Sequence, residues 1–258
     1  FNLNLYNNAE SLKSEKIQNC NFVSQENSYS NSVEKLKSFS IQLKILNERK
    51  WKKTLINNQI SYAKDNSFTY DAPYSEAEII FDNQLGFKCT TKAKIKPHGD
   101  LKDHFVDYKT GLDEVYEIPS LKVKLVENNF FGIVEFRLFK PKTRNYNNEI
   151  VASSIFEDLG FLSPRTASVN IIYNKSSYPS IFQEKINKEF LENNKLVEGP
   201  IYSGDERFVF KYDELNQSKE SGISKHKLAN SEWIKDSSQN YEVSAEALEV
   251  LNTVNYFY

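Results

Sequence analysis

Residues 87–97 read FKCTTKAKIKP and alternate between two kinds of side chain. The smaller and more apolar residues take every second position, at Cys89, Thr91, Ala93 and Ile95, and the positions between them are mostly lysines, at Lys88, Lys92, Lys94 and Lys96. Successive side chains of a β-strand point to opposite faces, so this alternation predicts a strand with one buried and one solvated face.

Three further segments point to strands around this one. Residues 76–81 (EAEIIF) form a short apolar run, and residues 132–139 read GIVEFRLF. Residues 120–126 (SLKVKLV) alternate again, with Lys122 and Lys124 on the outward face. A one-sided pattern of this kind is typical of antiparallel sheets. We therefore expect an antiparallel sheet with a polar, lysine-bearing face.

Helical spacing appears in other parts of the chain. Apolar residues from Val33 to Leu46 predict a helix within 31–56 that Ser32 can cap. Residues 147–161 predict a helix that Gly160 ends, with an apolar stripe of Ile150, Val151, Ile155, Phe156 and Leu159. Two shorter helices are expected at 187–196 and 244–254.

The remaining segments complete the expected domain. Residues 168–174 and 178–186 read as strands, and a further strand is expected to begin within 205–215. Residues 57–75 read as a loop, 216–238 as a polar linker and 1–30 as an extended or partly ordered leader. Helices and strands do not strictly alternate, which favours a single α+β domain over 31–258, an antiparallel sheet with packed helices.

The composition excludes some classes of function. The chain has 258 residues and a net charge of −2, which argues against a general nucleic-acid binder. No apolar run approaches the roughly 18 residues that a membrane span needs. The chain starts at Phe1 and contains no Met, which indicates a processed mature chain or a fragment. The oligomeric state cannot be read from the sequence.

Two cysteines, Cys20 and Cys89, leave the redox compartment open. They occur without a CxxC motif or a Cys/His cluster, so the sequence predicts no zinc site. A disulfide between them would suit an extracytoplasmic or secreted protein. Two separate buried thiols would fit the sequence equally well.

The segment HGDLKDH at 98–104 is the densest group of candidate metal ligands. His98, Asp100, Asp103 and His104 are all residue types that bind metals. The alternative, which we favour, is a polar turn at the end of a strand, in which Gly99 adopts an unusual backbone angle.

Several charged residues could bind phosphate or form ordinary ion pairs. The alternating lysines, including Lys122 and Lys124, would neutralise phosphate charge or lie on a solvated sheet face. A second basic group comprises Arg137, Lys140, Lys142 and Arg144. Glu184 lies in an apolar run, where a carboxylate needs a partner. A lysine or arginine would supply an ion pair, and a kinase-type lysine–glutamate role is the functional alternative.

Taken in order, several segments resemble one family. They are KAKIKPHGDLKDHF at 92–105, SLKVKL at 120–125, PKTR at 141–144, and NEIVASSIFEDLG followed by FLSPR at 148–165. This order is similar to that of CotH-like proteins, the spore-coat protein H family of atypical kinases. The resemblance covers residues 75–258 and is closest to the N-terminal part of such proteins.

The resemblance implies a distantly protein-kinase-like fold and a phosphotransferase that uses ATP with magnesium or manganese, on a possible protein substrate. His98, Gly99 and Asp100 would form the turn near the phosphates, Lys122 or Lys124 would neutralise them, and Glu184 would orient the lysine or contact the nucleotide. This sequence departs from the family pattern at His98, where members often carry arginine or lysine, and at Asn187, where an acid is usual.

Residues 185–258 contain no match to the family's catalytic and metal-binding aspartate motifs. The chain would then be either the nucleotide-binding part of a phosphotransferase or a non-catalytic member. An extracytoplasmic structural or binding protein of the cell envelope or coat is the alternative function. A hydrolase or metal enzyme that uses His98 and His104 is a third, supported only by their spacing.

Overall fold

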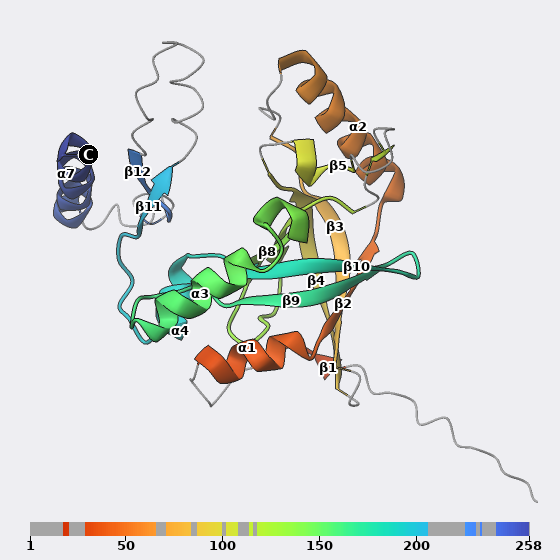
Figure 1. Cartoon of the computed structure of the whole chain (residues 1–258), viewed down its shortest axis with the longest axis horizontal. Helices are drawn as coiled ribbons and strands as arrows, with labels where there is room; N and C mark the ends of the chain where they lie inside the picture. The colour runs from red at the N-terminus through yellow and green to blue at the C-terminus, as the bar shows by residue number, and fades with distance from the viewer. Residues whose placement is uncertain are drawn as a thin grey trace, which may run out of the picture.

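The computed structural model describes residues 18–20, 29–65, 71–83, 87–99, 102–107, 114–115, 118–205, 225–230, 233 and 241–257. Its central feature is a sheet that closes on itself (Figure 1). The strands follow the order β4, β3, β2, β9, β10, β8 and β7, and β7 pairs back onto β4. Their bounds are Lys88–Pro97, Ser75–Asp82, Ser40–Ile45, Thr166–Tyr173, Ser176–Glu184, Glu135–Phe139 and Leu121–Leu125.

This closure corrects the expected fold class. The chain forms a seven-stranded mixed β-barrel and not a kinase-like α+β sheet with packed helices. The strand β4 has a partner on each edge, because Ile95 pairs with Ser75 of β3 and also with Val123 of β7. The sheet is mixed because β2 and β9 run parallel, whereas the other neighbouring strands of the barrel are antiparallel.

The alternation in residues 87–97 now has a clear cause. Cys89, Ala93 and Ile95 are almost fully buried, whereas Lys92 and Lys94 are exposed. The buried side chains fill a core that includes several aromatic rings; Phe81 stacks on Phe130 with ring centroids 3.7 Å apart. The predicted strand and its polar face are therefore confirmed, but the polar face is the outside of a barrel.

A short strand near the N-terminus is attached to the barrel by a covalent bond. The strand β1 (Gln18–Asn19) pairs in parallel with the start of β4. Cys20, the next residue, forms a disulfide with Cys89. Of the two alternatives that the sequence left open for the cysteines, the structure shows the disulfide.

The helix expected within 31–56 is wrong in its middle part. The chain forms α1 (Tyr29–Lys37), then β2, then α2 (Glu48–Asp65). In β2, Ile41, Leu43 and Ile45 are buried at every second position, which is the period of a strand. The sequence did not reveal this alternation because the segments on both sides of it have helical spacing. The loop expected at 57–75 is also wrong over its first half, because α2 continues to Asp65.

The helix predicted at 147–161 is present as α3 (Asn148–Asp158). Gly160 follows it at a φ of +79°, in the left-handed region that ends many helices, as expected. The predicted apolar stripe, however, is not a core contact, because Val151, Ile155, Phe156 and Leu159 are all exposed. The helix buries only Ser153, whose hydroxyl donates a hydrogen bond to Thr166 Oγ1 at 2.9 Å.

The C-terminal elements agree in part with the sequence. The helix α4 (Lys188–Asn193) is capped by Asn187, which accepts a hydrogen bond from the Phe190 amide. The predicted final helix lies within α7 (Tyr241–Phe257). The expected linker contains β12 (Lys225–Leu228), which pairs with β11 (Tyr202–Asp205).

Other sequence predictions fall on residues that the structure does not describe. These are most of the leader, the strand expected in 205–215 apart from Asp205, and much of the linker. Two more short pieces, β5 (Val106–Asp107) and β6 (Glu114–Val115), pair with each other, and two short 3-10 helices, η1 (Lys102–His104) and η2 (Pro141–Arg144), complete the described elements. Among the described helices, none is long and apolar enough to cross a membrane.

Candidate functional site: a cationic cluster around His98

Basic side chains form a row across the outside of three neighbouring barrel strands, and a glutamine continues the row on a fourth strand. Lys96 of β4 lies opposite Lys122 of β7, Lys122 lies opposite Arg137 of β8, and Arg137 lies opposite Gln183 of β10. Directly opposed residues of antiparallel strands are about 5 Å apart, and their side chains project from the same face. The register therefore brings three cations together, and they come from three different segments of the sequence.

A buried carboxylate anchors one end of this cluster. Glu135 Oε1 lies 2.9 Å from the Lys122 ammonium, and Glu135 Oε2 lies 3.1 Å from that of Lys185. Burial alone would raise the pKa of Glu135, but the hydrogen bond from Lys122 and the charge of Lys185 outweigh burial and lower the pKa. Burial likewise opposes the charge on Lys122, yet Glu135 raises the Lys122 pKa above its ordinary value.

His98 lies at the end of β4, on the same side as these cations. Burial has the largest effect on the pKa of His98, and together with the charges of Arg137, His104, Arg144 and Lys122, in that order, it lowers this pKa to about 3. The imidazole is therefore neutral at physiological pH, and one ring nitrogen can donate a hydrogen bond while the other accepts one. We use the name His98 cluster for His98, Lys96, Lys122, Arg137 and Arg144.

Arg144 joins the cluster from η2 and is held there by an aromatic ring. Its guanidinium carbon lies 4.2 Å from the ring centroid of Phe139, and the His98 ring lies 5.6 Å from the same centroid. The carboxylate of Glu149 is 3.7 Å from Arg144 Nε, which is a long ion pair between side chains that are 36% and 33% exposed. Lys96 pairs with Asp71, whose side chain is almost fully exposed. Both of these carboxylates could be displaced by a stronger anion.

The backbone conformation next to His98 depends on a glycine. Gly99 has a φ of +119°, as predicted for this position, and a Cβ added there would lie 2.2 Å from the His104 ring. His104 is buried, and its Nδ1 lies 2.9 Å from Ser120 Oγ. The His98 amide donates to the Ser120 carbonyl at 2.8 Å. These contacts fix the position of His98 at the end of its strand.

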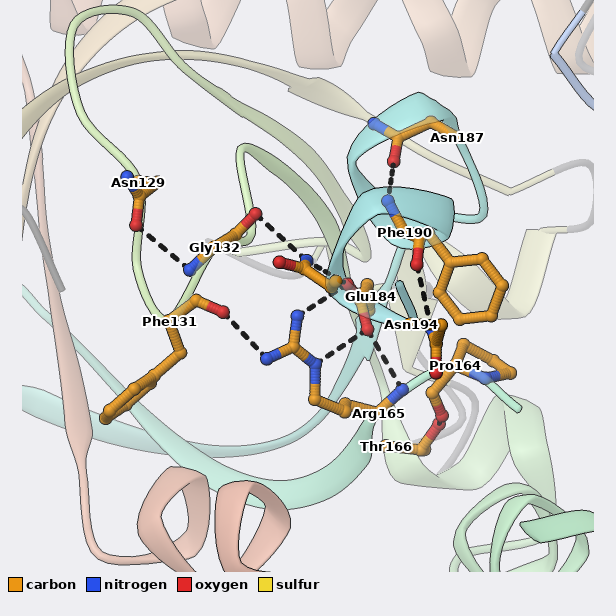
Figure 2. A network of polar contacts seen from close by, with 11 residues as sticks. Asn129, Phe131, Gly132, Pro164, Arg165, Thr166, Glu184, Asn187, Phe190 and Asn194 are labelled. Carbon is orange, nitrogen blue, oxygen red and sulfur yellow. Dashed lines mark hydrogen bonds and ion pairs between the residues drawn. The ribbon is translucent and has the colours of Figure 1, made fainter. Parts of the chain in front are cut away.

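The structure separates Glu184 from the other predicted phosphate-binding residues. Glu184 lies at one end of the barrel and forms two hydrogen bonds with Arg165, at 2.8 Å to Nε and 2.7 Å to Nη2 (Figure 2). The same guanidinium donates to the Phe131 carbonyl at 2.7 Å. The partner that the sequence required is thus an arginine, and the lysine–glutamate pair of the cluster is instead Lys122 with Glu135.

This second network extends to α4. Asn193 Nδ2 donates to the Gly132 carbonyl at 3.1 Å and to Glu184 Oε1 at 3.3 Å. Phe131 and Gly132 both have positive φ values, of 55° and 78°. The network holds this strained turn against the barrel end, and its groups face one another (Figure 2).

Of the predicted site residues, the structure thus groups His98 with Lys122, next to Gly99. Lys124 lies outside the cluster, because it pairs with Lys94 in the next outward row of β4 and β7, and its side chain is exposed. Asp100 lies outside the described residues. Among those that are described, no three His, Cys, Asp or Glu side chains gather closely enough to hold a metal ion.

The basic group predicted around PKTR divides in the structure. Arg137 and Arg144 join the His98 cluster, whereas Lys140 is buried with its ammonium 5.5 Å from the Tyr178 ring centroid. Lys142 is exposed. Glu135 and Lys185, which complete the cluster's ion pairs, were not singled out from the sequence. The position of Glu135 between apolar residues of GIVEFRLF was the available signal.

Comparison with the models of known protein families found no match. The curated protein sequences contain no significant relative either. The geometry of the His98 cluster therefore carries the functional argument.

Proposed function

We propose that this protein binds a phosphorylated ligand, of the nucleotide type, at the His98 cluster. The observation that carries the proposal is a partly buried, neutral imidazole placed among three lysine and arginine charges, those of Lys122, Arg137 and Arg144. Their shared effect on His98 means that a positive potential acts at that position. A phosphate group would be attracted by this potential and could accept a hydrogen bond from the imidazole.

The basic side chains of the His98 cluster would each contact the phosphate in a different way. Lys122 supplies a point charge, while the planar guanidinium groups of Arg137 and Arg144 are suited to two parallel hydrogen bonds to phosphate oxygens. Because Lys185 also pairs with Glu135, Lys122 can turn toward a ligand without leaving that carboxylate unpaired. Phosphoryl transfer relies on this kind of positioning and charge neutralisation.

The resemblance to CotH-like proteins supports a nucleotide as the ligand and a phosphotransferase as the full activity. The resemblance also implies magnesium or manganese, but the described residues of this chain offer no ligand set for a metal. No step of the proposal therefore depends on a metal held by the protein.

Calorimetric titration with ATP, and separately with inorganic pyrophosphate, tests the proposal. We expect Lys122→Gln to weaken binding by at least about tenfold, since one charge-assisted hydrogen bond contributes about 1.5–3 kcal/mol. Lys124→Gln is the matched control, because it removes the same charge two residues away on the same strand. Equal affinities for both variants, or an absence of heat with the unaltered chain, would refute the proposal.

A second candidate is a non-catalytic, extracytoplasmic binding or structural protein of the cell envelope or coat. The Cys20–Cys89 disulfide favours it, because such bonds persist in oxidising compartments. Alkylation of the native protein followed by mass spectrometry tests this point. Unreacted cysteines that become reactive only after reduction support the extracytoplasmic location, and two freely alkylated thiols contradict it.

A further inference from the structure

The helix α3 presents an apolar surface that no other part of the described chain covers. Val151, Ile155 and Leu159 are all more than half exposed, although they recur with the spacing of one helix face. Phe156 and Phe161 extend the same surface, and their rings meet edge to face at 6.1 Å. Asp158 lies on this face in the last turn, where no basic residue offsets its charge. A negative charge at that end is unfavourable with the helix dipole.

The helix α2 presents a second exposed face with the opposite charge. Its buried side consists of Trp51, Thr54, Leu55 and Asn58. On the other side, Ile56 and Ile60 are at least half exposed, and they follow three exposed cations, Arg49, Lys52 and Lys53. Basic residues thus come first along this face of α2, whereas on α3 the acidic residue comes last.

The two faces match residue by residue when the helices run antiparallel. On α2, Ile56 and Ile60 follow Lys53 by three and seven positions, and on α3, Ile155 and Val151 precede Asp158 by three and seven positions. Lys53 would then face Asp158, Ile56 would face Ile155 and Ile60 would face Val151. With a rise of about 1.5 Å per residue, each set spans about 10 Å of its helix.

Within one copy these faces do not cover each other, since both are exposed in the folded chain. Figure 1 shows α2 and α3 at separate places around the barrel. We infer that the apolar face of α3 binds the basic and apolar face of α2 from a second copy of this chain. The contact joins two different surfaces, so two copies can make it reciprocally in a two-fold dimer, or successive copies can add head to tail into a ring or a filament.

The contact is small, which sets its strength. The contact involves one 11-residue helix and part of an 18-residue helix. Its buried surface area is therefore at the low end for specific interfaces, below about 1,200 Å². Association is therefore weak and depends on protein concentration. This property is independent of ligand binding at the His98 cluster, which lies on other elements.

Sedimentation analysis of the full chain over a range of concentrations tests this contact. We expect the average mass to rise above that of the monomer as the protein concentration increases, because the association is weak. Lys53→Glu or Asp158→Lys alone should weaken association about tenfold, and the two changes combined should restore it, because the ion pair is rebuilt with reversed sign. Neither residue contributes to the barrel core, so the variants remain folded.

Cysteine cross-linking distinguishes this contact from other ways to cover α3. A mixture of Ile60→Cys and Val151→Cys proteins should form a mixed disulfide, whereas Ile60→Cys with Leu159→Cys should not, because Leu159 lies at the opposite end of the seam. Cross-links formed by Val151→Cys alone would show that two α3 helices pair, and they would overturn the proposal. A monomer at every concentration, or no rescue by the double charge reversal, would also overturn it.

Discussion

Two buried glutamates of this barrel form ion pairs in very different surroundings. Glu184 and Arg165 are both almost fully buried, with 3% and 10% of their side chains exposed, and they bond each other through two parallel contacts. Glu135 is also buried, with 7% of its side chain exposed, but its partners Lys122 and Lys185 reach it from the surface and remain 26% and 19% exposed. The first pair closes a barrel end, and the second belongs to the outer face.

The difference determines what each pair can do. Arg165 also holds the Phe131 carbonyl, so it cannot turn toward a ligand without breaking the barrel end. Lys122 shares Glu135 with Lys185, and its ammonium can be solvated. The same chemical pair, a carboxylate and a cation, is therefore structural at one place and available for binding at the other.

The largest expected effect comes from breaking the closed pair. Arg165→Leu leaves the Glu184 carboxylate buried without its cation, and we expect the free energy of unfolding to fall by about 3–5 kcal/mol. Urea denaturation followed by circular dichroism measures this loss. Replacing both residues by leucine should recover much of it, because no isolated charge remains. If the double variant is as unstable as the single one, the closed pair is not the cause.

The second prediction concerns the pH dependence of the open side. His98 has a pKa near 3 in the folded protein and about 6.5 when unfolded, so the unfolded chain binds the extra proton between these values. The stabilising contribution of neutral His98 to the free energy of unfolding is therefore fully present above about pH 6.5. It falls by up to about 1.4 kcal/mol for each pH unit toward pH 3. His98→Gln should flatten this part of the stability curve. An unchanged slope would contradict a neutral His98 among cations.

The third prediction compares the open pair with the closed one directly. Lys122→Gln should lower the free energy of unfolding by only about 1 kcal/mol, because Lys185 still neutralises Glu135 and the lost contact is partly solvated. The same denaturation experiment measures it. A loss as large as that of Arg165→Leu would remove the distinction between the two pairs.

The smallest effect is expected from an exposed ion pair, which serves as the reference for the Glu184–Arg165 and Glu135–Lys122 pairs. Lys44 and Glu78 form an ion pair at 3.0 Å across β2 and β3, and the lysine is mostly exposed. Lys44→Ala should change stability by less than about 0.5 kcal/mol in the same assay, since exposed pairs contribute little. A larger change would mean that outward charges contribute to barrel stability more than their exposure implies.

Strand β4 could be predicted from the sequence because its alternation is a local property. The closure of the barrel could not, since an outward lysine row is identical on an open sheet and on a barrel. Only the second partner of β4 distinguishes them, and that partner lies in a different segment. The strand β2 was missed because its apolar residues continue the spacing of the preceding helix.

The candidate site was predictable to a similar extent. Gly99 marked a turn and Lys122 an outward position, both of which depend on neighbouring residues alone. The grouping of Lys122 with Arg137 follows from the register of β7 against β8, which the sequence does not reveal. Glu184 was correctly judged to need a partner, but whether that partner bound a ligand or sealed the barrel depended on the fold.

The parallel pair in the barrel also affects how the chain folds. Ser40 of β2 pairs with Asn170 of β9, whereas the other edge of β2 pairs with the next strand in sequence, β3. During synthesis, β2, β3 and β4 can assemble long before β9 leaves the ribosome, and one edge of β2 then stays unpaired. Distant pairings of this kind slow folding, and unpaired edges promote aggregation. The chain is therefore most prone to aggregation before β9 is synthesised.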